Sequence, residues 1–285
     1  MPSSADELLE LLDLETIDVN LFRGTQPDTM LQRVFGGQVA GQSLVAGART
    51  VEPPLAVHSL HSYFLRPGDT AVPIVYDVER IRDGRSFATR RVVARQHGRP
   101  IYYMTVSFQK PEEGFDHQDV MPDVPSPAEA LDMAPLFRSD WQREWAALEL
   151  RWIGDSREGG PLPNDMHPAQ SRLWVRVNGK LDDEPLTHAA SFTYLSDMTL
   201  LASALVPHGV LISSPKVQSA SLDHAIWFHR PFRADEWLLY DQVSPSASGA
   251  RGLAIGRVFT EDRTLVATVA QEGLIRPRDP DHSAG

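Results

Sequence analysis

The 285-residue sequence contains no cysteine, which excludes disulfides, thiolate metal sites and cysteine nucleophiles together. This fits a reducing compartment, and we expect a cytoplasmic protein. Basic residues are scarce, since 27 Lys and Arg face 38 Asp and Glu and give a net charge of −11. Without a basic run to offset this acidity, we expect no nucleic-acid partner. We also find no segment long and apolar enough to span a bilayer and no signal peptide, so we expect no membrane insertion.

Several catalytic motifs are missing as well. No Gly-x-Ser-x-Gly elbow presents a serine nucleophile, and no His-Glu-x-x-His binds zinc. His58 and His61 are three residues apart, a spacing that sends them to opposite faces of a strand, so they make a poor metal pair. We therefore expect no metal and no other cofactor. Without a serine elbow or a cysteine, we expect no covalent intermediate.

What the chain does contain is a long internal repeat. Residues 58–67 (HSLHSYFLRP) align with residues 221–231 (SLDHAIWFHRP) on a shared Arg-Pro pair. The same register continues without gaps to two apolar stretches, residues 101–106 and 265–270. A repeat of this length predicts two copies of one fold.

The first half has the pattern of helices followed by antiparallel strands. Residues 4–15 have a capping box and leucines at helical spacing. Residues 34–48 look like a second helix, opened by glycines and packed tightly on all sides; they lack the lysine and further glycines of a phosphate loop. Runs rich in β-branched and aromatic residues predict strands at 58–66, 73–82, 86–96 and 101–109.

The second half repeats this order. We expect one long helix over residues 191–206, and strands at 172–177, 219–229, 236–244, 249–260 and 264–275. The proline-rich stretch between the halves is typical of a connection. We therefore expect an N-terminal domain over 1–112, a connection over 113–170 and a C-terminal domain over 171–285. Each domain would lay one helix across an antiparallel sheet, an α+β architecture.

Several segments also resemble one family, the type II (TesB-like) acyl-CoA thioesterases, and span nearly the whole chain in the expected order. These segments are residues 34–38, 58–69, 194–197, 222–231 and 271–276. The resemblance implies a double hot-dog fold, in which two helix-wrapped sheets pair as a pseudo-dimer. It implies hydrolysis of acyl-CoA to a free fatty acid and CoA. It also implies that these protomers associate into a homo-oligomer.

The resemblance points to Asp197, Ser221 and Gln271 as a catalytic trio. Asp197 would take a proton from water, while Ser221 and Gln271 would fix the water's position. Gln271 could also donate to the thioester oxygen. The family more often carries threonine at the position of Ser221. From the residues alone, Asp197 near the start of a helix would be an ordinary N-cap with its pKa lowered from about 3.9.

Two rival functions stay open. A hot-dog enoyl-CoA hydratase would want an Asp/His pair near the helix, but the nearest histidine, His188, would precede that helix. A non-catalytic acyl-CoA-binding module would not need the trio. Asp223 and His224 form no dyad, because neighbouring strand residues point to opposite faces.

Substrate contacts are less determined by the sequence. The acyl chain would lie in an apolar tunnel between the halves, with Tyr63, Phe64, Trp227 and Phe228 as candidates. Candidate cations for the CoA phosphates are Arg66, Arg85, Arg90, Arg91, Arg230 and Arg251. Matching Phe35 to Tyr194 and extending the repeat register places Gln38, Val57 and Ser107 where the second copy has Asp197, Ser221 and Gln271. We therefore expect the first copy to supply structure and the second to carry the chemistry.

Overall fold

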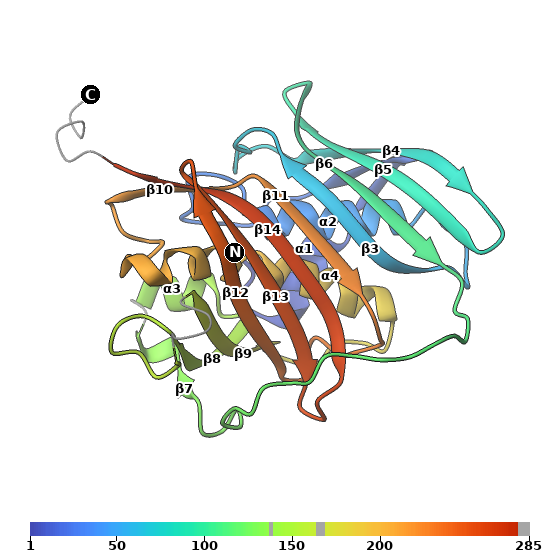
Figure 1. Cartoon of the computed structure of the whole chain (residues 1–285). Coiled ribbons are helices and arrows are strands. Elements are labelled where there is room, and N and C mark those ends of the chain that lie inside the picture. Colours follow the sequence, from blue (N-terminus) through green and yellow to red (C-terminus); the bar gives the residue numbers. More distant parts are fainter. Residues whose placement is uncertain (137–138, 164–168, 279–285) are drawn as a thin grey trace.

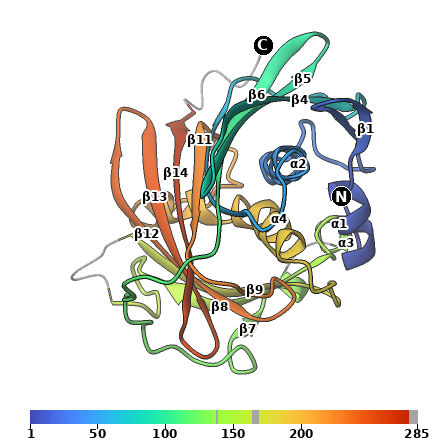
Figure 2. The same ribbon diagram turned by 90° about the vertical axis from the view of Figure 1, so that its right-hand side faces the viewer.

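The computed structural model describes residues 1–136, 139–163 and 169–278. Across these residues the two halves share one antiparallel sheet of fourteen strands (Figure 1). The sheet curls around the central helices, so that α2 and α4 lie inside it side by side (Figure 2). This is the architecture predicted from the repeat.

The first half contributes one edge of the sheet, in the order β1-β2-β4-β5-β6-β3. The predicted helices and strands are confirmed, and two short strands, β1 and β2, were not predicted. The elements are α1 (Ala5–Leu12), β1 (Glu15–Asp18), β2 (Leu21–Gly24), α2 (Gly36–Ala48), β3 (Ala56–Phe64), β4 (Ile74–Asp83), β5 (Phe87–Gln96) and β6 (Arg99–Gln109).

The second half continues the sheet in the order β11-β14-β13-β12-β9-β8-β7, with β10 paired to β14 alone. Part of the predicted connection belongs to this sheet, because β8 pairs with β9. The elements are β7 (Leu131–Asp132), η1 (Ala134–Leu136), α3 (Ser139–Glu144), β8 (Leu148–Asp155), β9 (Gln170–Val177), α4 (Pro185–Ser196), η2 (Leu200–His208), β10 (Val217–Ser221), β11 (Asp223–Phe228), β12 (Leu238–Ser248), β13 (Arg251–Thr260) and β14 (Leu265–Pro277).

The prediction of one helix over residues 191–206 is wrong. The helix starts earlier, at Pro185, and stops at Ser196; a separate 3₁₀ helix, η2, begins at Leu200. The hydroxyls of Thr193 and Ser196 bond to carbonyls of preceding turns, and such bonds weaken a helix near its end. Asp197 therefore lies at a break between two helical segments.

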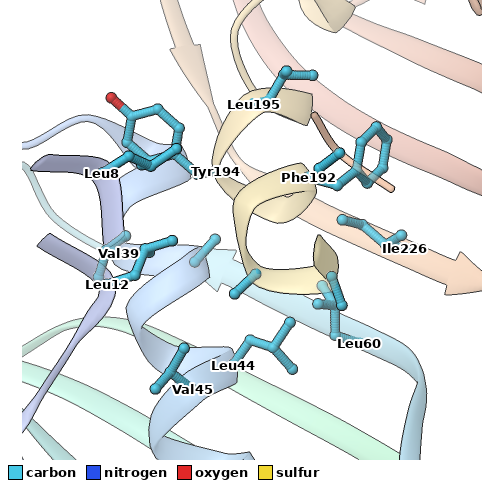
Figure 3. Packing of buried hydrophobic residues seen from close by; sticks show 14 of the residues in the cluster. Leu8, Leu12, Val39, Leu44, Val45, Leu60, Phe192, Tyr194, Leu195 and Ile226 are labelled. Carbon is cyan, nitrogen blue, oxygen red and sulfur yellow. The ribbon is translucent and has the colours of Figure 1, made fainter. Parts of the chain in front are cut away.

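The helical stretch Pro185–His208 also corrects the expectation about apolar segments. By length and composition it could cross a membrane, and 78% of its most apolar window is buried inside the protein. Side chains of α4 pack with those of α1, α2, β3 and β11 in one cluster (Figure 3), while Leu201, Ala204 and Leu205 of η2 pack in another. Such burial is what the core helix of a helix-wrapped sheet requires.

The strand pairing tests the repeat directly. Between β3 and β11, His61 pairs with Ala225, Tyr63 with Asp223 and Ser59 with Trp227. The repeat relates Tyr63 to Trp227 and Ser59 to Asp223, each pair 164 positions apart. The Tyr63–Asp223 pair therefore corresponds to the Ser59–Trp227 pair, and the His61–Ala225 pair corresponds to itself. The two copies therefore meet across a local twofold axis, like the subunits of a dimer.

The ungapped register fails at the last strand. Ser62 and Ile226 correspond under the shift of 164, but Ser62 pairs with Met104 and Ile226 with Val269. Met104 and Val269 are 165 positions apart, because one more residue lies between the paired Phe259 and Leu265 than between their counterparts Arg95 and Pro100. Gln271 therefore corresponds to Val106, and its predicted match with Ser107 is wrong.

The predicted match of the helices is also wrong. The two helices run antiparallel: Gly37 lies against the carbonyl of Tyr194, and Gly41 against that of Ala190. Gly41 and Ala190 are each the sixth residue of their helix, so the helices cross near corresponding points. When the two helices are superposed from their first residues, Gly36 and Pro185, Asp197 matches Ala48. Gln38 instead lies near the beginning of α2.

Candidate active site

The three predicted catalytic residues converge in the structure. Asp197 follows the last residue of α4, Ser221 ends β10, and Gln271 lies in the middle of β14. The Ser221 hydroxyl donates to Asp197 Oδ1 over 3.2 Å. The Gln271 side-chain amide donates to the same oxygen. Three residues that span 74 positions of the sequence thus meet at one carboxylate.

A strand irregularity aims Ser221 at this carboxylate. Ser221 pairs with Gly273 while Ala225 pairs with Ala270, so the register shifts by one residue around Leu222. A bulge of this kind redirects the side chains on either side of it. Space for Gln271 comes from the neighbouring strand, where its cross-strand partner is the small Ala254. Gln271 is completely buried, as its place in an apolar run suggested.

Asp197 lies at the C-terminal end of α4, and the predicted position at a helix start is wrong. The negative end of the helix dipole disfavours a carboxylate there. Burial raises the pKa of Asp197 to about 6, although hydrogen bonds from Gln271, Ser221 and the Gly37 N–H oppose this shift. The expected lowering of this pKa is therefore wrong. Asp197 as a whole residue is half-buried.

The first half completes the site through the start of α2. A Cβ atom on Gly36 would overlap Asp197 Oδ2 and would lie 2.8 Å from the Phe64 ring. A Cβ atom on Gly37 would overlap the Tyr194 carbonyl. Only glycine lets the helix approach this closely. The predicted interpretation of these glycines as tight packing is confirmed, and the packing partner of Gly36 is the Asp197 carboxylate.

The orientation of the Gln271 amide follows from chemistry. A carboxylate only accepts hydrogen bonds, so the nitrogen of the amide must face Asp197. Gln271 Oε1 then points elsewhere, and it is buried without a hydrogen-bond partner in the described part of the chain. A free acceptor therefore lies beside the carboxylate.

The histidines near the site are buried or lie at a distance from Asp197. His224 is completely buried, its Nε2 is 2.8 Å from the Ser196 hydroxyl, and burial lowers its pKa to about 3. The carboxylate of Asp223 accepts from the Glu272 N–H instead, as expected for a neighbour on the opposite face. His188 lies inside α4, not before it, at the end remote from Asp197.

The predicted aromatic contacts divide between the two faces of the sheet. Tyr63 and Trp227 lie on the outer face and are 50% and 37% exposed, so they line no tunnel. Phe64 lies beside Gly36 and the ring of Tyr102, next to the site. Phe228 stacks on Phe232, away from Asp197.

Most of the predicted CoA-binding cations are already engaged. Arg90, Arg91 and Arg230 form ion pairs with carboxylates, and Arg66 donates to a backbone carbonyl. Arg251 pairs with Glu272 but also lines an open groove. The other cations of that groove had no signal in the sequence beyond their charge.

A helix-wrapped double sheet in which a carboxylate accepts hydrogen bonds from a serine and a buried amide fits the class of double hot-dog thioester hydrolases. Comparison with known proteins agrees. Residues 159–274 match the acyl-CoA thioesterase family model, and residues 25–109 match the model of its N-terminal domain. The fold also resembles a hot-dog protein of Alicyclobacillus acidocaldarius, with a TM-score of 0.76 at 22% identity over 95% of this chain and 98% of that one.

Individual relatives cover almost the entire chain. Acyl-CoA thioesterase 2 of Haemophilus influenzae is 39% identical over 97% of this chain and 99% of its own length. Human acyl-coenzyme A thioesterase 8 is 42% identical over 93% of this chain and 88% of its own. The crystal structure of an acyl-CoA thioesterase II (TesB2) from Mycobacterium marinum is 47% identical over 95% of this chain and 98% of its own, with a TM-score of 0.83. The chain belongs to the acyl-CoA thioesterase family, and it hydrolyses the thioester bond of acyl-CoA.

Proposed function

We propose that Asp197 is the general base of this hydrolysis and acts on a water molecule directly. The water donates one hydrogen to Asp197 and the other to the free Oε1 of Gln271. Its lone pair is then directed at the thioester carbon. A carbon–oxygen bond forms as the carbon–sulfur bond breaks, and the proton taken by Asp197 passes to the CoA sulfur.

The observation that carries this proposal is the pair of acceptors, one charged and one neutral, next to each other in a largely buried site. Two donors fix the carboxylate through one oxygen, Oδ1. A base with a pKa of about 6 is mostly ionised at neutral pH and still basic enough to take a proton. Ser221 holds the carboxylate in place, so we assign it a positioning role.

The alternative to direct attack by water is a covalent route in which Ser221 is the nucleophile, and an experiment can distinguish the two. We expect no acyl-enzyme mass in rapidly quenched reactions. We expect Ser221→Ala to lose roughly tenfold in kcat, since only a positioning bond is removed. An adduct of acyl mass on Ser221, or a Ser221→Ala loss as large as that of Asp197→Asn, would contradict direct attack by water.

We further propose that the protein associates through the outer face of the sheet, where its two halves meet. His61 and Trp227 contact edge to face at 5.0 Å, and Tyr63 stacks on Tyr103 at 5.6 Å. Exposed aromatic clusters are typical of interfaces. Light scattering should give a multiple of the 31.7 kDa chain mass that falls with Tyr63→Ser. A mass of one chain for the wild type would refute association.

A further inference from the structure

An open groove of about 1250 Å³ lies beyond the end of β10 that is remote from Ser221. Apolar side chains of η2 and β10, including Leu205 and Val217, form part of its lining. Four cations also line it: Lys216, Arg251, Arg276 and Arg278. No carboxylate is among the described residues that line the groove.

This concentration of charge is unusual in so acidic a protein. Arginines elsewhere mostly form ion pairs, as Arg172 and Arg257 do with Asp241. Within the described ranges, by contrast, no ion pair involves Lys216, Arg276 or Arg278. Several cations left without counter-charges create a positive potential that attracts anions.

One strand links this groove to the catalytic residues. β10 runs from Val217, at the groove, to Ser221, whose hydroxyl contacts Asp197. At about 3.3 Å per residue, the four steps between Val217 and Ser221 span roughly 13 Å. β10 pairs with β14 along one edge only, so its other edge presents backbone N–H and C=O groups without a strand partner.

The chemistry of this arrangement matches the long axis of CoA. Acyl-CoA carries a thioester at one end of its CoA portion, two amides along the pantetheine arm, and three phosphate groups on adenosine at the other end. A strand with a free edge can pair with amides. Cations beside an apolar surface suit phosphates attached to a purine.

We propose that this groove binds the phosphates of CoA, with Lys216 and Arg276 as the principal contacts. The free edge of β10 would guide the pantetheine arm from there to the site. The inference rests on the reaction taking place at Asp197. It assigns the groove residues to binding of the substrate and not to chemistry.

The test compares two substrates with the same acyl group, an acyl-CoA and an acyl-pantetheine, which lacks adenosine and all phosphates. We expect Lys216→Ala and Arg276→Ala each to raise the KM for acyl-CoA roughly two- to fivefold, the scale of an exposed ion pair. The double variant should raise it roughly tenfold. Values of kcat, and all constants for acyl-pantetheine, should stay at wild-type levels.

Arg99→Ala is the matched control, because Arg99 is an exposed cation of the other half for which the described residues provide no ion pair. It should leave both substrates unaffected. Unchanged KM values for acyl-CoA in the double variant, or equal losses with both substrates, would overturn the proposal. Wild-type turnover in Asp197→Asn would instead refute the proposed base, so the two failures are distinguishable.

Discussion

The two halves of this protein pair their strands in a similar register, but they differ in the residues at three corresponding positions. The second half has Asp197, Ser221 and Gln271, which converge on one carboxylate. At the corresponding points the first half has only apolar residues: Ala48, Val57 and Val106. The second copy of the fold therefore has polar side chains at these three positions, and the first copy has apolar ones.

A neighbouring pair of residues shows the same exchange. Gln271 pairs across the strands with the small Ala254, whereas Val106 pairs with Arg90. The Arg90 side chain is 1% exposed, and its guanidinium donates to Thr50. In the first half a buried arginine thus lies opposite the apolar strand residue, while in the second half a small residue leaves room for the Gln271 amide.

The first half is nevertheless part of the site. Its α2 helix begins at Gly36 and Gly37, directly against Asp197 and the end of α4. If Asp197, Ser221 and Gln271 carry the reaction as proposed, the second half supplies the reacting groups and the first half supplies the close-packed wall beside them. Substitutions in the second half should therefore have different effects from substitutions in the first half.

The largest effect should come from Asp197→Asn. Loss of a general base typically lowers kcat by roughly 10²- to 10⁴-fold, and the isosteric amide should leave the fold intact. Thiol release from acyl-CoA measures the turnover, and circular dichroism checks the fold. Asp223→Asn is the matched control, since its side-chain oxygen can still accept from Glu272; it should change kcat less than about threefold. Equal losses in both variants would remove the special role of Asp197.

The next largest effect should separate Gln271 from its counterpart Val106. Gln271→Ala removes the partner of both Asp197 and the water, and should lower kcat by roughly 10²-fold. Val106→Ala should leave kcat near the wild-type value and lower the free energy of unfolding by about 2 kcal/mol, because it opens a cavity against α2. A large loss of kcat in Val106→Ala would mean that the first half also contributes chemistry.

A smaller loss should follow from Gly36→Ala. The added methyl would overlap Asp197 Oδ2, so the carboxylate must move, and we expect kcat to fall roughly tenfold. Gly114→Ala provides the control, because nothing lies within 4 Å of a Cβ atom there. If Gly36→Ala retains full activity, the first half does not constrain the base.

A final prediction is a dependence on pH that links activity to stability. Because the pKa of Asp197 is about 6, kcat/KM should fall roughly tenfold per unit below that pH. In the unfolded chain this pKa is about 3.9, so below that value Asp197 is protonated in both states and costs no stability. As the pH rises from 3.9 to 6, the unfolded chain ionises first and the native state loses stability.

Asp197→Asn should therefore resist urea better than the wild type at pH 8 and no better at pH 4. Urea midpoints at the two pH values measure this difference. If Asp197→Asn is less stable than the wild type at pH 8, the buried charge of Asp197 does not lower the stability of the native state.

Much of the fold could be predicted from the sequence, because the repeat and its hydrophobic alternation fix the order of helices and strands. The trio came from family resemblance, and only the buried Gln271 had a physical signal of its own. The end of α4 could not be predicted, since residues 191–206 contain no proline or glycine to end a helix, and the hydroxyls that bond to carbonyls near the break are found only in the structure. Nor could the match of Gln271 with Val106, because the extra turn residue leaves no trace in the alternation.

The cationic groove could not be predicted either. Lys216 and Arg276 are 60 positions apart, and they come together only through the pairing of β10 with β14. The candidate arginines chosen from the sequence mostly proved to be committed to ion pairs, which depend on tertiary contacts.

The number of active sites per chain tests the central claim most directly. Isothermal titration with a thioether analogue of acyl-CoA, which cannot be hydrolysed, counts the sites on the intact protein. If only the second half carries a site, one analogue should bind per chain, and binding should weaken when Lys216 and Arg276 are replaced. Two equivalent analogues per chain would contradict the account, because the first half would then have kept a working site of its own.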